Sequence, residues 1–265
     1  MENKHHMTVE DNIFFAKRNI VDLIYKSAKL EGLAVTFPDT YSVINGGIIN
    51  GMTFEDAVII NNLKRAWQFI LSTTDYPVNF SYICQIHKYI GESLEEYNAG
   101  FLRNKMIYVT MGDEEPFTPD LLIEADVGDE VGSIMERENE TERAIELMLY
   151  LARRQMFNDG NKRAAMLAAN RVMISGGAGV ISVPPSKLGE FIYYLTEFYK
   201  SNDMSEAKEF IYNNCISGNG VEKCEPETSL TGMERLRAAE KKKAQSRENK
   251  NNEVKKAPDK SEPSL

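Results

Sequence analysis

Apolar residues recur at helical spacing along most of the chain, and this pattern predicts a set of amphipathic helices. Residues 10–31 carry apolar positions every three or four residues, and Gly32 follows them as a helix stop. Thr53 precedes acidic residues as a helix N-cap does, and a further helix is expected from Ser81. Composition and spacing predict four more helices, at residues 141–154, 162–175, 191–199 and 205–215.

One segment departs from the helical pattern. Residues 106–111 (Met-Ile-Tyr-Val-Thr-Met) are rich in β-branched and aromatic types, and turn formers follow them at Gly112, Asp113, Pro116 and Pro119. They are the only good candidate for a strand or hairpin. The fold class predicted from the pattern is therefore all-α with one short β-hairpin.

Composition divides the chain into regions. Residues 235–260 contain ten Lys or Arg against four Asp or Glu, although the whole chain carries a formal charge of −9. Low apolar content there predicts that residues 221–265 form a solvated, disordered tail, with contact to an acidic partner or nucleic acid as the alternative. The remaining regions are an N-terminal helical region, residues 1–35, and a core, residues 36–220.

Composition also argues against several classes of protein. No apolar run reaches the roughly 18 residues that a membrane span needs, and the charged N-terminus lacks a signal-peptide pattern, so we expect a cytoplasmic protein without membrane contact. The negative charge disfavours general binding to nucleic acid. The three cysteines lack metal-site spacing, and histidines are few. The oligomeric state stays open, homo-oligomers included.

The segment from Phe157 to Arg163 combines a tight turn with two cations at the predicted start of a helix. Cations at a helix N-terminus oppose the helix dipole, and a bound anion would account for them. Free backbone N–H groups, Gly160, Lys162 and Arg163 together suit a phosphate, and Asp159 beside them suits a Mg²⁺ ion that bridges phosphate oxygens. The alternative is an ordinary helix connection with a solvated Lys-Arg pair.

The same residues carry a family resemblance. Gln155-x-Phe157-x-Asp159-Gly160-Asn161-Lys162-Arg163 resembles the signature loop of the Fic/Doc family, His-x-Phe-x-Asp/Glu-Gly-Asn-Gly/Lys-Arg, at every defining position except the first. Weaker agreement extends from about residue 27 to residue 215 and includes Asn62, Ala66, His87, Gly100, Arg103 and the segment 178–181. The resemblance implies a Fic-type helical core.

The resemblance also implies a chemistry. In such a protein Asp159 would bind Mg²⁺, Gly160, Asn161 and Lys162 would hold the phosphates of ATP, and Arg163 would stabilise the transferring charge. The hairpin at residues 106–118 would be the family's flap, which binds a target protein by strand pairing. Most members transfer AMP from ATP to a protein hydroxyl (AMPylation), whereas Doc-like members, which share a lysine at the position of Lys162, transfer a phosphate.

Two residues depart from the family pattern. Gln155 stands where a histidine accepts the proton of the attacking hydroxyl, and an amide has no useful basicity. General-base assistance is worth roughly 10²–10⁴-fold, and a glutamine can still orient a hydroxyl or water. Met166 stands where AMP-transferring members have a second arginine, as in the Doc-like pattern. The expected function is AMP transfer to a protein hydroxyl, with weak activity included; the alternatives are a Doc-like phosphotransferase and a catalytically degenerate nucleotide-binding or partner-binding module.

A regulatory motif is also predicted. Ser27-Ala28-Lys29-Leu30-Glu31-Gly32 resembles the family's inhibitory motif, Ser/Thr-x-x-x-Glu-Gly/Asn. Ser27 and Glu31 share one helical face, and the family's glutamate pairs with the second arginine. Because Met166 replaces that arginine, Glu31 is expected to pair with Arg163 or Arg171. The alternative is an ordinary glutamate at a glycine-capped helix end.

Overall fold

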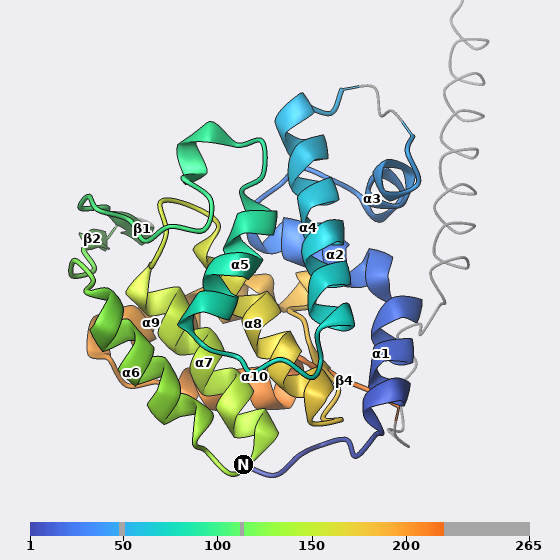
Figure 1. Cartoon of the computed structure of the whole chain (residues 1–265). Coiled ribbons are helices and arrows are strands. Elements are labelled where there is room, and N and C mark those ends of the chain that lie inside the picture. The colour runs from blue at the N-terminus through green and yellow to red at the C-terminus, as the bar shows by residue number, and fades with distance from the viewer. Residues whose placement is uncertain (48–50, 112–113, 220–265) are drawn as a thin grey trace, which may run out of the picture. The chain divides into compact units, whose positions relative to one another are not determined.

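The computed structural model describes residues 1–47, 51–111 and 114–219 (Figure 1). The predicted tail, residues 221–265, lies outside the described residues. The all-α prediction is confirmed, and the helices of the described residues are α1 (Val9–Arg18), α2 (Ile20–Leu30), α3 (Phe37–Ile44), α4 (Phe54–Ser72), α5 (Phe80–Ile90), α6 (Glu124–Met135), α7 (Glu140–Arg154), α8 (Asn161–Ser175), α9 (Leu188–Ser201) and α10 (Ser205–Asn214), with short 3₁₀ turns η1 (Glu95–Tyr97) and η2 (Pro185–Lys187). Within these residues, no helix is long and apolar enough to cross a membrane.

Side-chain caps fix several of the helix starts. Thr53 accepts a hydrogen bond from the Asp56 N–H, as the sequence predicts, and Thr8, Asn79 and Asn139 cap α1, α5 and α7 in the same way. Each cap satisfies one of the N–H groups that a helix leaves without a partner in its first turn. The polar residue before each of these four helices therefore decides where it begins.

The structure corrects the prediction of one helix over residues 10–31. The chain bends at Asn19, which ends α1 and begins α2, and the Asn19 amide donates to the Phe15 carbonyl at 2.9 Å. Asparagine side chains compete in this way with the helix's own backbone bonds. Two helices were not predicted: α3, although Thr36 and Asp39 form a capping box, and α6, which contains two glycines and no side-chain cap.

The predicted hairpin is present, with shorter strands. Strand β1 (Val109–Met111) pairs antiparallel with β2 (Glu114–Phe117), with Val109 opposite Phe117 and a register irregularity between Val109 and Met111. A second two-stranded sheet was not predicted: β3 (Val180–Ile181) pairs antiparallel with β4 (Ile216–Ser217). Strands of two residues carry no periodicity that a sequence could display.

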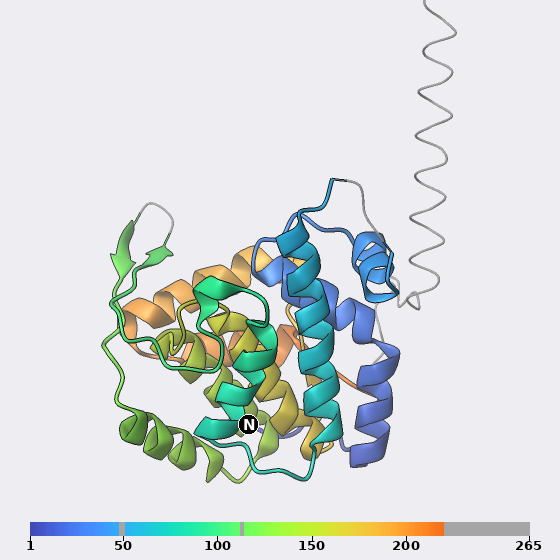
Figure 2. The same cartoon turned by 45° about the horizontal axis from the view of Figure 1, so that its top comes forward.

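Helix α8 lies at the centre of the helical packing and contacts α7, α5, α4, α1 and α2 (Figure 2). Thirteen of its fifteen residues are buried, including Ala164, Ala165, Ala168 and Ala169, whose small side chains allow close approach of neighbouring helices. The loop that precedes α8 is therefore attached to the most enclosed helix of the domain.

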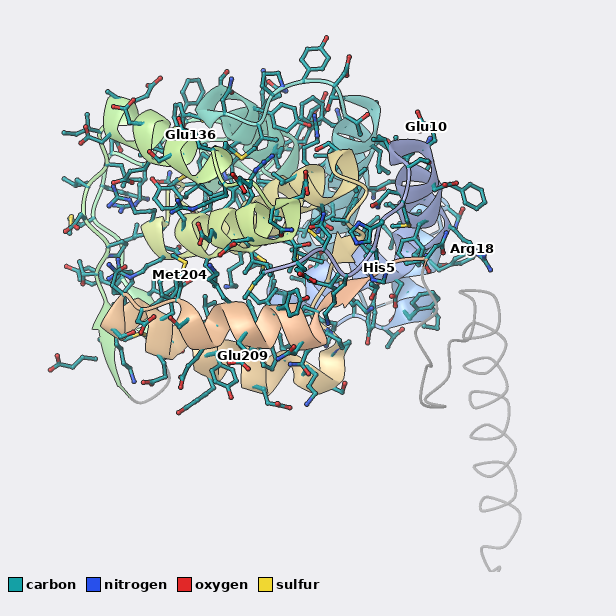
Figure 3. All side chains as sticks on the ribbon, turned by 90° about the horizontal axis from the view of Figure 1, so that it is seen from below. His5, Glu10, Arg18, Glu136, Met204 and Glu209 are labelled. Carbon is teal, nitrogen blue, oxygen red and sulfur yellow. The ribbon has the colours of Figure 1, made fainter. Side chains whose placement is uncertain are left out.

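The N-terminal segment is fastened to this core (Figure 3). The Met7 N–H donates to the Gly177 carbonyl at 2.8 Å, and Asn12 exchanges two hydrogen bonds with the backbone of Gly179. These bonds hold α1, and through it α2, against the end of α8. Helix α2 ends at Leu30, so Glu31 is held beside the start of α8.

Candidate functional site

The loop between α7 and α8, residues 155–160, is shaped by two residues with left-handed backbones. Gln155 ends α7 with φ of 48°, and Gly160 precedes α8 with φ of 74°. A Cβ atom at residue 160 would lie 3.1 Å from Ile90 Cγ2 and 3.2 Å from Tyr97 Cε1. Glycine is therefore required at position 160 by both its backbone and its neighbours.

Asn161 closes the loop on itself. Its Oδ1 accepts from the Phe157 N–H at 2.8 Å, and its Nδ2 donates to the Phe157 carbonyl at 2.9 Å. The Asn161 side chain is thus used within the loop, and its backbone N–H is the group left for a ligand. Phe157 itself is buried beneath the loop, as an apolar plug.

His87 supports the loop from α5. Its ring is fully buried and stacks on Phe157 with centroids 3.7 Å apart. The Gly100 N–H donates to Nδ1 at 3.0 Å, so the proton is on Nε2, which donates to the Asp159 carbonyl at 2.9 Å. Burial lowers the pKa of His87 to about 4. His87 is therefore a core histidine whose two ring nitrogens both have hydrogen-bond partners.

Arg103 connects the loop to the hairpin. Its guanidinium donates to the carbonyls of Gln155 (2.6 Å), Lys105 (3.0 Å) and Asp120 (2.5 Å), and its N–H donates to Met156 O at 3.0 Å. Burial lowers the pKa of Arg103, yet a guanidinium stays charged at neutral pH. One buried cation therefore joins the end of α7 to both sides of the hairpin stem.

Arg163 is the buried cation of the predicted phosphate site. Its side chain is 3% exposed; Nη2 donates to Tyr97 Oη at 2.7 Å and lies 3.4 Å from Asp159 Oδ1, and Nε lies 3.3 Å from Glu31 Oε1. Lys162 Nζ lies 3.4 Å from Glu31 Oε2. Burial lowers the pKa of Arg163, but Glu31, Tyr97 and Asp159 outweigh it and leave the pKa raised.

The polar groups of this cluster are not all satisfied. Arg163 Nε and Nη1 and Glu31 Oε1 are buried and lack a geometrically adequate hydrogen bond among the described residues. No side chain caps α8, and its first internal bond runs from the Ala164 N–H to the Gly160 carbonyl, so the N–H groups of residues 161–163 precede the helix's own bonding. The arrangement offers several donors to an anion.

Asp159 is the candidate metal ligand. Its side chain is 58% exposed, and Oδ1 accepts from the Gly160 N–H at 2.5 Å. Among the described residues no group of three or more His, Cys, Asp or Glu side chains could hold a metal ion. A single carboxylate suits Mg²⁺ that takes its other ligands from phosphate oxygens and water.

The structure separates the two arginines offered as partners of Glu31. Glu31 pairs with Arg163, as predicted, whereas Arg171 donates to the Thr73 carbonyl at 3.0 Å and to the Tyr76 carbonyl. Pairing of Glu31 with Arg171 is therefore wrong, because the turn after α4 uses that guanidinium.

Two further residues of the predicted motif have structural positions. The buried Ser27 hydroxyl donates to the Leu23 carbonyl of its own helix at 2.8 Å, and Gly32 has φ of 80°, which suits the end of α2. Met166 is buried in α8. The structure therefore brings Glu31 to the loop, while the Ser27 hydroxyl is bonded to its own helix.

Gln155 is oriented by a residue that sequence reasoning missed. Its Nε2 donates to the Ala152 carbonyl at 2.6 Å and lies 3.4 Å from the hydroxyl of Tyr199, which itself donates to Ala152 O at 2.8 Å. Burial raises the pKa of the Tyr199 phenol, so that it stays protonated. Nothing in the helical pattern of residues 191–199 distinguishes this tyrosine from its neighbours.

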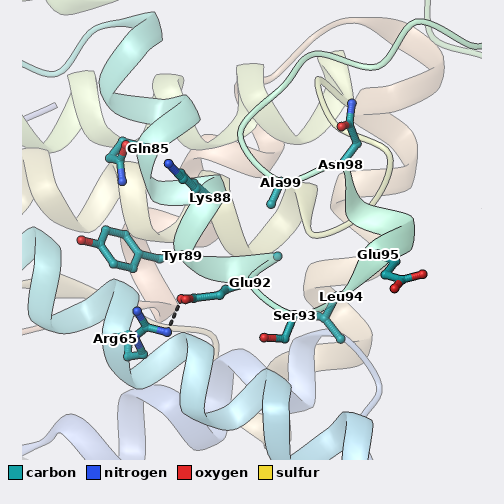
Figure 4. Close-up of a pocket in the computed structure, with 11 residues that line it drawn as sticks. Arg65, Gln85, Lys88, Tyr89, Glu92, Ser93, Leu94, Glu95, Asn98 and Ala99 are labelled. Carbon is teal, nitrogen blue, oxygen red and sulfur yellow. Dashed lines mark ion pairs between the residues drawn. The ribbon is translucent and has the colours of Figure 1, made fainter.

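A cavity of about 740 Å³ lies beside the end of α5 and η1 and is separate from the loop (Figure 4). Arg65 and Glu92 form an ion pair there, and Lys88, Ser93 and Asn98 also line it. Its charges are mixed, and none of the predicted site residues lines it.

Comparison with known proteins agrees with this geometry. Residues 77–173 match the family described as the Fic/DOC family. The chain is 24% identical over 177 residues to protein adenylyltransferase fic-1 of Caenorhabditis briggsae, covering 63% of this chain and 34% of that protein. The match thus spans about a third of that relative's length.

Solved structures share the fold. Fic-1 of C. elegans matches with a TM-score of 0.62 and 19% identity, over 74% of this chain and 59% of that one. A signaling protein from Bacteroides thetaiotaomicron VPI-5482 that contains the same type of domain matches with a TM-score of 0.65 and 18% identity, over 76% of this chain and 80% of that one.

Proposed function

Because the chain belongs to the Fic/DOC family through its domain at residues 77–173, we propose that it transfers the AMP part of ATP to a hydroxyl group of a target protein. The adenylyltransferase name of its relative from C. briggsae supports this reaction rather than another of the family. A cytoplasmic location, where ATP is available, is part of the proposal.

The observation that carries the proposal is the incompletely satisfied, buried cation at the start of α8. Arg163 has two nitrogens without a full hydrogen bond beside an uncapped helix N-terminus. A buried guanidinium without full hydrogen bonding is costly in free energy, and the Glu31 carboxylate at 3.3 Å from Nε offsets part of that cost without completing the hydrogen bonds, so a bound anion would stabilise the arrangement. ATP phosphates supply that anion.

Each residue of the loop has a separate role in the proposed binding of ATP. In this proposal the N–H groups of Asn161 and Lys162 would bind phosphate oxygens, whereas the Gly160 N–H is engaged by Asp159 Oδ1, and Arg163 would neutralise the charge that develops during transfer. Asp159 holds Mg²⁺, which when bound neutralises phosphate charge. Gly160 permits the close approach of the backbone.

Gln155 limits the rate of this reaction. The target hydroxyl oxygen attacks the α-phosphorus, the bond to pyrophosphate breaks, and the hydroxyl proton passes to solvent because the amide cannot accept it. Tyr199 and the Ala152 carbonyl engage the amide nitrogen, which leaves the amide oxygen as the group that orients the hydroxyl. Slow transfer, by roughly 10²–10⁴-fold relative to a histidine, is the consequence.

Two other functions remain as second candidates. Met166 removes a cation that would face the nucleotide and favours Doc-like transfer of the γ-phosphate. The engagement of the Gln155 amide with the backbone of its own helix favours a nucleotide-binding module without turnover.

Glu31 gives the site a built-in inhibitor within this proposal. Its carboxylate lies within 3.4 Å of both Lys162 and Arg163, the cations assigned to the phosphates. The phosphates can bind both cations fully only when the Glu31 carboxylate moves away from Lys162 and Arg163 or shares them with the phosphates, because like charges in a partly buried site repel each other.

ATP labelled separately at the α and γ phosphates tests the proposal. The protein, Gln155→His and Glu31→Gly are each incubated with cell lysate. Label from the α position, increased in both variants, is the expected result. Label from the γ position alone would show a phosphotransferase, and no label from any variant would leave only the binding module.

A further inference from the structure

Exposed apolar side chains gather around the hairpin. Of the eleven large apolar side chains that are exposed in the described residues, five fall within residues 101–123: Phe101, Met106, Tyr108, Leu121 and Ile123. Phe101 is 68% exposed and Tyr108 is 72% exposed, so the chain itself covers little of either ring. Large exposed apolar side chains concentrated in one stretch of the chain are typical of segments that bind a partner.

The same region is strongly acidic. Residues 104–130 contain eight Asp or Glu and one Lys or Arg, which is Lys105. Among the described side chains, five carboxylates are exposed and make no ion pair with the rest of the described chain: Glu115, Asp120, Glu124, Asp126 and Asp129. We call these five acids together with the five apolar side chains the hairpin face.

The hairpin face is placed beside the loop. Arg103 holds Lys105 O and Asp120 O together and reaches Gln155 O with the same guanidinium. Phe117 of β2 packs on Tyr199, with ring centroids 5.2 Å apart. Both views of the fold show the hairpin and α6 along one side of the domain (Figures 1 and 2). The stem of the hairpin is thus tied to the backbone of Gln155.

We propose that the hairpin face selects its target by charge, and that the bound segment carries lysine or arginine residues next to an apolar or aromatic anchor. The inference rests on the proposed function, since it names the class of sequence that surrounds the modified hydroxyl. Although Arg103 and Arg153 attract Asp120, none of the five carboxylates forms an ion pair with another described residue, and such acids favour a cationic partner and repel an acidic one, which sets specificity and association rate. The exposed rings add apolar contact and cation–π attraction to Lys or Arg.

Peptide binding tests the inference without any need for catalysis. Fluorescein-labelled peptides of equal length are compared in which one serine and one leucine are flanked by lysine, by alanine or by glutamate. Fluorescence anisotropy is measured with the full chain, without nucleotide, at two salt concentrations. The lysine peptide is expected to bind about tenfold more tightly than the glutamate peptide, and this preference should shrink in high salt.

Charge reversal locates the surface. Asp120→Lys with Glu124→Lys is expected to abolish the preference, and Leu121→Ser with Ile123→Ser to weaken all three peptides equally. Glu209→Lys, an exposed acid on α10 with no ion pair to another described residue, is the matched control and should leave the preference unchanged (Figure 3).

The outcomes separate the two proposals. Equal binding of all peptides, or loss of the preference in Glu209→Lys, would overturn the charge inference. So would a concentration-dependent dimer, measured by analytical ultracentrifugation, that Asp120→Lys with Glu124→Lys dissociates, because the occupant would then be a second copy. Selective binding without transfer of label from ATP would uphold the inference while the proposed reaction fails.

Discussion

Acidification should destabilise the protein through His87 in a predictable way. The ring is neutral in the folded state because the Gly100 N–H occupies Nδ1, and burial lowers its pKa from 6.5 to about 4. The unfolded chain binds a proton near pH 6.5, so the stabilisation from a neutral ring is complete above that pH and is lost as the pH falls toward 4. Between pH 7.5 and 4.5 the loss amounts to about 2.5 kcal/mol.

Urea unfolding followed by circular dichroism across this pH range measures the loss. Carboxylates such as Glu142 and Glu146, whose pKa values are lowered in the fold, also contribute at low pH, so the difference between variants is the informative quantity. His87→Gln should be less stable at pH 7.5 but should lose about 2.5 kcal/mol less on acidification. His6→Gln serves as the control in which an exposed ring is replaced.

An identical pH slope in His87→Gln and the unaltered protein would refute this account. Should His87→Gln fail to fold, nuclear magnetic resonance of the unaltered protein provides the second measurement. The His87 ring protons should show no titration above pH 5, whereas a midpoint near 6.5 would mean that the ring is accessible and its stack on Phe157 is open.

Three further changes test the loop and its inhibitor. Gly160→Ala should lower the free energy of unfolding by about 1–2 kcal/mol, because a left-handed backbone and two close neighbours both oppose a Cβ atom. Binding of Mg·ATP should raise the melting temperature of the unaltered protein, and Gly160→Ala should abolish that rise. An unchanged rise in the variant would show that the backbone of the loop can move. Asn161→Ala should lower the free energy of unfolding by about 2–3 kcal/mol, since both hydrogen bonds to the Phe157 backbone are lost. Urea unfolding measures this change, and a decrease below about 0.5 kcal/mol would show that the two bonds contribute little to stability. Glu31→Gln should tighten ATP binding several-fold in calorimetry by releasing Arg163, and an equal or weaker affinity would contradict the inhibitory role.

Local signals were sufficient for much of the fold. Thr53 marks the start of α4 because the capping hydroxyl and the Asp56 N–H that it binds are only three residues apart. Gly32 marks the end of α2 because its positive φ is a property of that one residue. The β3–β4 sheet could not be predicted in the same way, because each strand has two residues and their pairing depends on distant segments.

The candidate site likewise combines features that are local in the sequence with contacts between distant segments. The loop from Asp159 to Arg163 is contiguous, so its turn and charges are visible in the sequence. Its supports are not contiguous: Tyr97, Arg103 and Tyr199 reach the loop from three other segments. The family resemblance includes Arg103, whereas no spacing in the chain marks Tyr97 or Tyr199, and the contacts of all three arise from packing.

Arg103 fastens the hairpin only at its base, through the carbonyls of Lys105, Pro119 and Asp120. Substitutions nearer the turn therefore alter the outer part of the hairpin without touching the bonds that fix Gln155. Within the proposed function, substitutions in the outer part of the hairpin would change which target binds, while the stem would keep the loop in place. Tip and stem should accordingly diverge at different rates among close relatives.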